Sequence, residues 1–380
     1  MTDRWTTPER RALRTLAKEV VAREVAPHVA DWEREGMLPR SLHKAFAAAG
    51  LLGVSFPEAV GGGGGDAIDS AILAEEVMLG GGSGGVIASL FTHGIALPHI
   101  VGHGMPDLVD RYVRPTLAGD LIGALAVTEP DGGSDVAGLR TTAVREGDVY
   151  VVNGAKTYIT SGVRADFVTT AVRTGGEGYA GISLLVIDKG LPGFTVSKPL
   201  DKMGWRSSDT AELSFDDVRV PVTQLVGEEG QGFRYIMENF QSERLALAVH
   251  AYSTAQRCLD LVLAWVQDRQ TFGRPLVSRQ VVRHKVAEMA RQTDVARTYT
   301  RAAYEKWLGG DDAVLEVSMA KNTACFACDH VVDEAVQLFG GLGYMRESEV
   351  ERHYRDSRIL RIGGGTDEIM NEVIAKRLGM

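Results

Sequence analysis

Apolar residues recur every three or four positions over the first third of the chain, as in Leu13, Leu16 and Val20. This spacing places them on one face of an α-helix and predicts helices from Thr7 to about Leu117. Thr7 is a suitable N-cap, because its hydroxyl precedes a proline at the first helical position and a carboxylate in the first turn. We therefore place the first helix start at Thr7.

Two glycine runs, at residues 61–65 and 80–85, interrupt the helical pattern. Neither run follows a strand and opens a helix, which is the context that a phosphate-binding glycine loop requires. We interpret both runs as flexible connections between helices.

Between about Gly123 and Glu228 the pattern changes to short β-prone runs separated by glycine and proline. Such runs predict short antiparallel strands, over Phe167–Val172, Ile182–Ile187, Phe194–Val196 and Glu212–Phe215. Two further runs, Val149–Val152 and Lys156–Thr160, flank Asn153-Gly154. Because Asn-Gly readily takes the positive φ angles of a type I′ turn, we expect these two runs to form a hairpin.

Helical spacing returns after Gly232 and continues to the end of the chain. It predicts helices over about Phe233–Gln267, Val277–Trp307 and Asp312–Phe339, and a final helix after Thr366. The sequence therefore predicts an α+β protein: an N-terminal α-helical domain (1–122), a middle antiparallel β domain (123–228) and a C-terminal four-helix bundle domain (229–380).

Composition excludes some partners. The formal net charge of −9 and the pI near 5.6 argue against nucleic acid, which requires a basic face. No apolar run reaches membrane-spanning length, and the first residues carry no apolar signal core. Only three cysteines occur, which suits a reducing cytoplasm. We interpret Cys325 and Cys328 as small core residues on a helix, and we expect no metal site.

The segment from Leu125 to Gly162 contains most of the candidate chemistry. Its loop from Thr128 to Asp135 offers hydroxyls and glycine N–H groups, which can hold a phosphate or a polar ring edge, although the local chemistry alone favours a solvated turn. In order and spacing the segment resembles the acyl-CoA dehydrogenase family. The matching residues are Val127, Thr128, Glu129, Pro130, Gly133, Ser134, Asp135, Asn153, Gly154, Lys156, Tyr158, Ile159 and Thr160.

Further stretches extend this resemblance over nearly the whole chain, among them Lys202–Thr210, Phe215–Pro221, Arg269–Gly273 and Gln337–Tyr344. The resemblance implies FAD as the cofactor. It also implies that one segment reaches across a dimer to a neighbouring copy's flavin. The implied cofactor contacts are Leu125, Val127, Thr128, Gly133, Ser134, Tyr158, Ile159, Thr160, Arg269, Phe272, Gln280, Gln337, Gly340, Gly341, Thr366 and Glu368.

The resemblance also requires a carboxylate that takes the α-proton of an acyl thioester while a hydride leaves the β-carbon for the flavin. Most members carry this base as a glutamate just before the last helix, where this chain has Gly364. A subgroup resembling the isovaleryl-CoA and long-chain enzymes carries it early in the first helix after the β domain, where this chain has Glu243. Glu243 interrupts an apolar helical row, so burial would raise its pKa. An ion pair with Arg244 or another cation is the alternative.

By the same resemblance, the Gly364 N–H would bind the thioester carbonyl and stabilise the enolate. Ser134, Gln241, Arg244 and Gly365 would contact the substrate, although a salt bridge to a core acid is an alternative for Arg244. The implied activity is oxidation of an acyl-CoA to a trans-2-enoyl-CoA. The implied partners are an electron-transfer flavoprotein and three further copies in a homotetramer, a dimer of dimers. Three alternatives remain open: a dehydrogenase of carrier-protein-bound acyl chains, an acyl-CoA oxidase, or a non-catalytic flavin or acyl-CoA binder.

Overall fold

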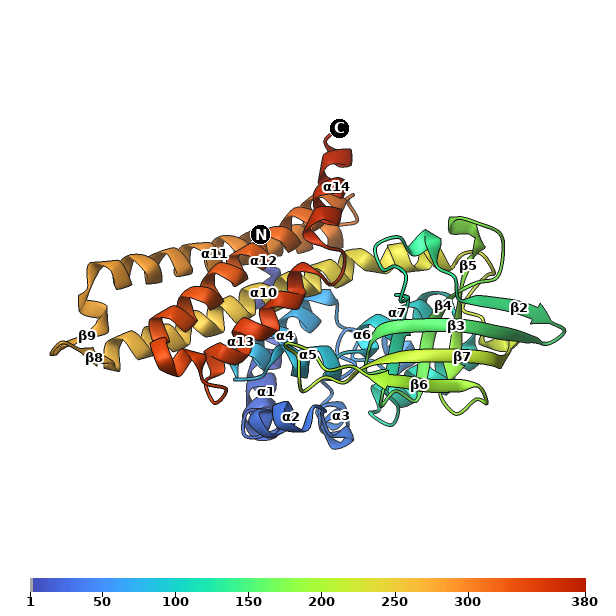
Figure 1. Ribbon diagram of the computed structural model, residues 1–380, viewed down its shortest axis with the longest axis horizontal. Helices are drawn as coiled ribbons and strands as arrows, with labels where there is room; N and C mark the ends of the chain where they lie inside the picture. Colours follow the sequence, from blue (N-terminus) through green and yellow to red (C-terminus); the bar gives the residue numbers. More distant parts are fainter. Residues whose placement is uncertain (1–2) are drawn as a thin grey trace.

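The computed structural model describes residues 3–380. Three regions follow one another along the chain, as Figure 1 shows: short N-terminal helices, a curled sheet, and long C-terminal helices that extend away from the sheet. The longest helix begins beside the sheet and ends at the opposite extremity of the molecule. This arrangement positions the sheet, the N-terminal helices and the first turns of the long helix around one junction.

The N-terminal region is helical, as the periodicity predicts. The Thr7 side chain accepts a hydrogen bond from the Arg10 N–H and caps the first helix, which confirms the predicted start. The helices are α1 (Pro8–Glu24), α2 (Val29–Glu35), α3 (Arg40–Ala48), α4 (Ala67–Leu79), α5 (Gly84–Leu90), α6 (His93–Ala96), α7 (Pro98–His103), α8 (Pro106–Leu108) and α9 (Arg114–Leu117).

The two glycine runs connect helices, as predicted, except that Gly84 and Gly85 begin α5, and several of the glycines are closely packed. A Cβ added to Gly62 would lie 2.1 Å from the Phe56 carbonyl oxygen, and one added to Gly85 would lie 2.3 Å from Ser207 Oγ. Real Cβ atoms do not come this close to other atoms. Neighbouring backbone and side chains pack so closely against Gly62 and Gly85 that these positions require glycine.

The middle region is one seven-stranded sheet with the order β1-β4-β2-β3-β7-β6, in which β5 pairs with β4. Most neighbours are antiparallel, and β1 runs parallel to β4. The four strands predicted from the β-prone runs are present. The strands are β1 (Gly123–Ala126), β2 (Thr142–Glu146), β3 (Val149–Thr160), β4 (Phe167–Arg173), β5 (Ile182–Asp188), β6 (Phe194–Pro199) and β7 (Thr210–Pro221).

Strands β4 and β5 are buried on both faces. Val168, Val172, Leu185 and Ile187 pack inside the curled sheet, while the alternating residues on the opposite face pack against α7, α9 and the start of the long helix α10 (Gly232–Asp268). A strand that is buried on both faces has apolar residues at nearly every position, and the sequences of β4 and β5 show this pattern. These two strands therefore attach the sheet to the helices around the junction.

The hairpin predicted at Asn153-Gly154 is wrong. Residues 149–160 form one continuous strand, because β7 pairs with both of its halves. The register against β7 shifts between Val152 and Gly154, so Asn-Gly forms a β-bulge, with Gly154 at φ +146°. The actual hairpin joins β2 to β3 through Gly147, whose φ is +65°.

The C-terminal helices match the periodicity within a few residues. They are α10, α11 (Gln280–Leu308), α12 (Val314–Phe339), α13 (Glu349–Ser357) and α14 (Asp367–Arg377). The three long helices pack pairwise around a core that includes Cys258, Cys325 and Cys328, all buried free thiols. α13, which the periodicity did not predict, packs against α10 and α12, and α14 packs against α12 and projects from the bundle (Figure 1). A short hairpin of β8 (Gln270–Thr271) and β9 (Arg274–Pro275) joins α10 to α11.

The element bounds lie close to the predicted domain bounds, which stay a prediction. β1 begins at Gly123, and α10 begins at Gly232. No single helix in residues 3–380 is long and apolar enough to cross a membrane. The pair formed by Gly84–Leu90 and His93–His103 meets that test only together, is bent by 49°, and contributes fully buried residues such as Leu90 and Ile100 to the protein core.

Candidate active site

Glu243 lies three turns into α10, between Phe240, which packs with residues of the sheet, and Leu245, which packs in the core of the bundle. It shares a helical row with Ile236, Phe240 and Leu247, which are apolar and at least partly buried. The residue as a whole is half-buried, but its Oε1 atom is fully buried and accepts no hydrogen bond from any residue in 3–380. An unpartnered buried carboxylate oxygen is costly, which makes it a candidate functional group.

The surroundings of Glu243 favour its protonated form. Burial raises the pKa of the carboxyl to about 7, although the nearby Arg244 guanidinium acts in the opposite direction. Arg244 does not form an ion pair with Glu243. Its Nε donates to the Gly364 carbonyl oxygen at 3.2 Å, and its guanidinium lies 5.3 Å from the centre of the Phe240 ring. The ion-pair alternatives for Glu243 and for Arg244 therefore find no support in the contacts.

Gly364 and Gly365 form a left-handed turn before α14, with φ angles of +66° and +97°. A Cβ at Gly364 would lie 2.6 Å from Leu247 Cδ1, one helical turn beyond Glu243 on the same row. A side chain at position 364 would thus point at the row that carries Glu243. The two positions from which family members are expected to supply the base face each other across this junction.

Two cationic side chains donate hydrogen bonds to the carbonyl oxygens of the glycine turn. Arg244 binds the Gly364 oxygen, and Lys321 Nζ donates to the Gly365 oxygen at 2.7 Å. Within residues 3–380 the N–H groups of Gly364 and Gly365 donate no hydrogen bond. Sequence reasoning did not identify Lys321. The available signal was a charged residue within an apolar helical run, between the buried Val317 and Ala324.

Thr366 ends the glycine turn and caps α14. Its side chain accepts the Ile369 N–H at 3.3 Å, and Asp367 and Glu368 follow in the first turn, as predicted. Glu368 is exposed and Thr366 is half-buried. Gln241, two residues before Glu243, has a buried Oε1 without a hydrogen-bond donor in the described chain. Predicted substrate and cofactor residues therefore gather around Glu243 from α10, the glycine turn and α14.

The loop from Thr128 to Asp135 follows β1 at the edge of the sheet. Its Glu129 is buried and fully paired: Lys156 Nζ lies 2.8 Å from Oε1, and the N–H groups of Arg140 and Thr141 donate to the carboxylate at 2.6 and 2.9 Å. Burial alone would raise the pKa of Glu129, but Lys156 and these donors lower it below its usual value. Sequence reasoning noted Glu129 and Lys156 but assigned them no role; they fasten the loop to β3.

The rest of this loop faces outward. Gly133 and Ser134 are exposed, Leu125, Val127 and Thr128 are half-buried, and the Thr128 carbonyl accepts the Thr157 N–H at 2.9 Å. Tyr158 follows at the second bulge of β3. It has a φ of +60° and a side chain that is 69% exposed, whereas Ile159 is buried and Thr160 is half-buried. A left-handed aromatic residue with an exposed ring is strained, and such strain clusters at ligand sites.

A second group of predicted cofactor residues lies at the opposite end of the bundle. Phe272 sits at the tip of the β8–β9 hairpin, with φ +50° and a side chain that is 98% exposed. Arg269 lies over the Trp265 ring, which stacks on Phe339 at the end of α12, so Gln337, Gly340 and Gly341 are brought near the hairpin. A Cβ at Gly340 or Gly341 would meet no other atom of this chain within 4 Å.

The two groups are far apart in a single chain. Arg269 follows Glu243 by 26 residues on α10, which corresponds to about 39 Å of helix at 1.5 Å per residue. This separation exceeds the length of an extended FAD molecule. One chain therefore cannot offer both groups to the same cofactor.

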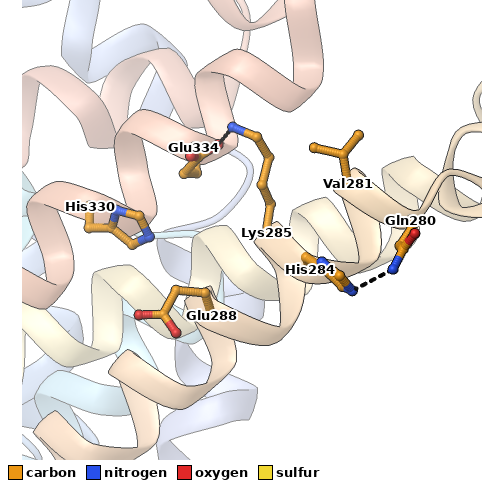
Figure 2. A pocket seen from close by; sticks show the side chains of 7 residues that line it. All are labelled: Gln280, Val281, His284, Lys285, Glu288, His330 and Glu334. Atoms are coloured by element: carbon orange, nitrogen blue, oxygen red, sulfur yellow. Dashed lines mark hydrogen bonds and ion pairs between the residues drawn. The ribbon is translucent and has the colours of Figure 1, made fainter.

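Gln280, the remaining predicted cofactor residue, lies at one end of a groove of about 520 Å³ between α11 and α12. Figure 2 shows Lys285 reaching Glu334 across the groove, and His330 and Glu288 projecting from the two facing helices. Glu243 does not line this groove. No group of three or more His, Cys, Asp or Glu residues in the described chain could hold a metal ion.

Chemically, the junction combines three elements. It has a carboxylate with a pKa near neutrality, a turn with two N–H groups that donate no hydrogen bond within residues 3–380, and an exposed polar loop beside a strained tyrosine. A base beside hydrogen-bond donors can remove a proton next to a carbonyl group and stabilise the resulting oxyanion.

Comparison with known proteins gives a consistent result. The family models described as "Acyl-CoA dehydrogenase, N-terminal domain", "middle domain" and "C-terminal domain" match residues 7–120, 124–218 and 230–379. The mitochondrial long-chain specific acyl-CoA dehydrogenase of Mus musculus is 36% identical over 96% of this chain and 85% of its own length. The cyclohex-1-ene-1-carbonyl-CoA dehydrogenase of Geobacter metallireducens is 38% identical over 98% of both chains.

Solved structures agree. One described as a "probable acyl CoA dehydrogenase" from Mycobacterium abscessus is 69% identical with a TM-score of 0.98, covering 99% of this chain and 100% of the other. A structure of PigA with FAD and proline is 27% identical with a TM-score of 0.94, covering 100% of this chain and 99% of the other.

Proposed function

The chain belongs to the acyl-CoA dehydrogenase family, and from this premise we propose that it is an FAD-dependent enzyme that oxidises an acyl-CoA to the trans-2-enoyl-CoA with Glu243 as the base. One observation carries the proposal: the buried, unpartnered Oε1 of Glu243 lies on the helical row that faces Gly364, where other family members are expected to have their glutamate. We therefore propose that Glu243 supplies the carboxylate at the reacting carbon, from a different element than Gly364.

Glu243 takes the α-proton. The α C–H bond breaks, the proton moves to the carboxylate, and the electron pair remains on the thioester as an enolate. A base with a pKa of about 7 suits this step at neutral pH, because it is substantially ionised and still holds a proton firmly. Burial supplies this pKa, and the engagement of Arg244 with Gly364 prevents an ion pair that would lower it further.

The glycine turn receives the developing negative charge. The N–H groups of Gly364 and Gly365, which donate no hydrogen bond within residues 3–380, are the candidates for hydrogen bonds to the thioester oxygen, and Arg244 and Lys321 fix the turn by binding its two carbonyls. Donors that are already fixed need no rearrangement when charge develops. Gln241 and Ser134 are proposed to orient the remainder of the thioester.

The residues present fit FAD, which supplies the acceptor for the β-hydrogen and its electron pair. The exposed loop at Gly133 and Ser134 offers N–H and hydroxyl groups, and Tyr158 presents an aromatic ring in a conformation that this chain alone does not justify. Arg269, Phe272, Gln280, Gln337, Gly340 and Gly341 lie too far from Glu243 to share its cofactor, so we assign them to the cofactor of a neighbouring copy. This geometry supports the proposed homotetramer, a dimer of dimers.

An electron-transfer flavoprotein is the proposed acceptor, and we propose a cytoplasmic location in accord with three buried, unpaired cysteines. Relatives of similar identity act, by their names, on long-chain and on cyclohexene-carbonyl thioesters, so the acyl group is left open.

The test is anaerobic mixing of the purified FAD-loaded protein with acyl-CoAs of graded length and branching, followed by flavin absorbance. We expect bleaching of the oxidised flavin with at least one member of the panel and formation of the enoyl-CoA. Bleaching only by an acyl group on a carrier protein would change the substrate class, and rapid reoxidation of the bleached flavin after oxygen is admitted would indicate an oxidase. Binding of acyl-CoA without any bleaching would reduce the protein to a ligand binder.

A further inference from the structure

Lys321 is a fully buried cation that the mechanism above uses only as a support. It lies on α12 with 0% of its surface exposed, and its Nζ donates to the Gly365 carbonyl oxygen at 2.7 Å. No carboxylate lies within ion-pair distance of it in the described chain. Burying a charge against a neutral carbonyl is expensive, and a neutral donor would hold the same oxygen at lower cost.

The carboxylates near Lys321 are directed elsewhere. Asp367, at the first turn of α14, binds Arg361 Nε at 2.5 Å, and Arg361 also binds Asp329 at 2.8 Å. The other titratable groups that act on Lys321 are Cys325 on its own helix and Arg244 on α10. Lys321 and Arg244 thus approach the glycine turn from two different helices, and each binds one of its two consecutive carbonyls.

Support of the turn alone does not require the charge. The neighbouring Asn322 already holds the same segment, since its Nδ2 donates to the Asp367 carbonyl at 3.2 Å and to Asn371 Oδ1 at 3.1 Å. A neutral side chain on α12 is therefore sufficient to attach the start of α14. The chain nevertheless places a cation at the adjacent position, bound to the carbonyl of the peptide unit that joins Gly365 to Thr366.

We propose that Lys321 is a positioning residue that fixes the Gly364–Gly365 turn and, through its positive charge, makes the α-carbon of the bound thioester more acidic. The carbonyl that Lys321 binds is polarised, and the cation lies beside the turn at which the enolate is proposed to form. Both effects favour the ionised substrate over the neutral one. This inference rests on the proposed function, because it requires an enolate to form at this turn.

The experiment uses the FAD-loaded protein and a 3-thia-acyl-CoA, in which sulfur replaces the β-carbon so that the α-proton can leave but no hydride can follow. The enolate of this probe gives a long-wavelength charge-transfer absorbance beside the oxidised flavin. Titration of that absorbance with pH gives the apparent pKa of the bound probe, a quantity that measures proton loss without turnover. Four variants are compared with the unaltered chain: Lys321→Gln, Lys321→Met, Lys321→Arg and Asn322→Leu.

We expect Lys321→Gln to raise the apparent pKa of the probe by about one unit, as expected for the loss of a nearby charge. Lys321→Arg, which keeps the charge, should titrate within a few tenths of a unit of the unaltered chain. Asn322→Leu, which loosens the same turn without removing a cation, should lower Tm and leave the probe pKa unchanged. This last variant is the matched control for a purely structural role.

The inference is overturned if Lys321→Gln titrates like the unaltered chain, or if Asn322→Leu shifts the probe pKa as much as Lys321→Gln does. If Lys321→Gln and Lys321→Met both lose FAD while Lys321→Arg keeps it and titrates normally, Lys321 belongs to folding and the inference is also overturned. Absence of the charge-transfer absorbance in the unaltered chain would instead count against the proposed function itself, so the two failures are distinguishable.

Discussion

Two glutamates, Glu129 and Glu243, each have a buried carboxylate oxygen but opposite environments. Glu129 accepts hydrogen bonds from the Lys156 ammonium group and from two backbone N–H groups, and its pKa lies below the usual value. Glu243 has a buried oxygen without any donor, and its pKa rises to about 7. Burial raises the pKa of both carboxyls, so the number of partners decides the outcome. The satisfied glutamate fastens the structure, and the unsatisfied one is available for chemistry.

The same contrast gives opposite linkage to pH. The folded pKa of Glu243 lies above the ordinary 4.5, so its contribution to stability is fully present below pH 4.5 and is lost as pH rises through about 7. The folded pKa of Glu129 is depressed, so its contribution is present above pH 4.5 and is lost as pH falls through the folded pKa.

The largest expected effect is the loss of flavin reduction when Glu243 is replaced. Glu243→Gln should lower the rate of flavin reduction by acyl-CoA about 10²- to 10⁴-fold, the usual contribution of a general base. FAD content and acyl-CoA binding should be retained, because the amide has nearly the shape of the carboxyl. Stopped-flow absorbance measures the rate. Full activity in this variant would remove Glu243 from the mechanism.

The second largest expected effect is a difference in the free energy of unfolding between the Glu129 and Glu243 variants. Glu129→Gln leaves the fully buried Lys156 without a counter-charge, and breaking such a pair costs about 3 to 5 kcal/mol. The free energy of unfolding, obtained from denaturant titration of each variant, should fall by that amount for Glu129→Gln and should change little for Glu243→Gln. Equal losses in the two variants would show that Glu243 also has a stabilising partner.

The pH profile of the unaltered enzyme sharpens the assignment. Only the ionised carboxylate can accept the α-proton, so flavin reduction should rise about tenfold per pH unit below pH 7 and level off above it. Single-turnover rates between pH 5 and 9 provide the profile. A rate that stays constant down to pH 5 would indicate a base with an ordinary carboxyl pKa.

The smallest effect concerns the alternative position. Gly364→Glu combined with Leu247→Ala in the Glu243→Gln background should restore part of the activity, about tenfold over Glu243→Gln, because a side chain at position 364 would point at the helical row that carries residue 243. The restoration should require Leu247→Ala, since a Cβ at residue 364 would lie 2.6 Å from Leu247 Cδ1 and the turn has φ +66°. Rescue that is equally strong without Leu247→Ala would show that the turn relaxes on its own.

Sequence alone predicted the elements whose pattern is local. The bounds of α10, α11 and α12 follow from apolar spacing, and the caps at Thr7 and Thr366 follow from residue type. The prediction of a hairpin at Asn153-Gly154 was wrong because β7, about sixty residues further along the chain, pairs with both halves of β3. This long-range pairing outweighs the local turn preference of Asn-Gly.

The site also combines features that the sequence predicted with contacts that only the fold creates. The resemblance located Glu243 and the glycine turn, and the apolar row around Glu243 suggested its burial. The partners could not be read from spacing: Lys321 meets Gly365, and Arg244 meets Gly364, only because α10, α12 and the C-terminal turn converge. Contacts between residues 44 and 120 positions apart carry no local sequence signal.

The central claim, that Glu243 takes the α-proton, is tested most directly by hydrogen exchange. The FAD-loaded protein is incubated in D₂O with a 3-thia-acyl-CoA, and mass spectrometry follows deuterium entry at the α-carbon. The unaltered chain should exchange this hydrogen rapidly, and Glu243→Gln should slow the exchange by at least 100-fold while still binding the thioester. Equal exchange in both proteins would contradict the claim and place the base elsewhere.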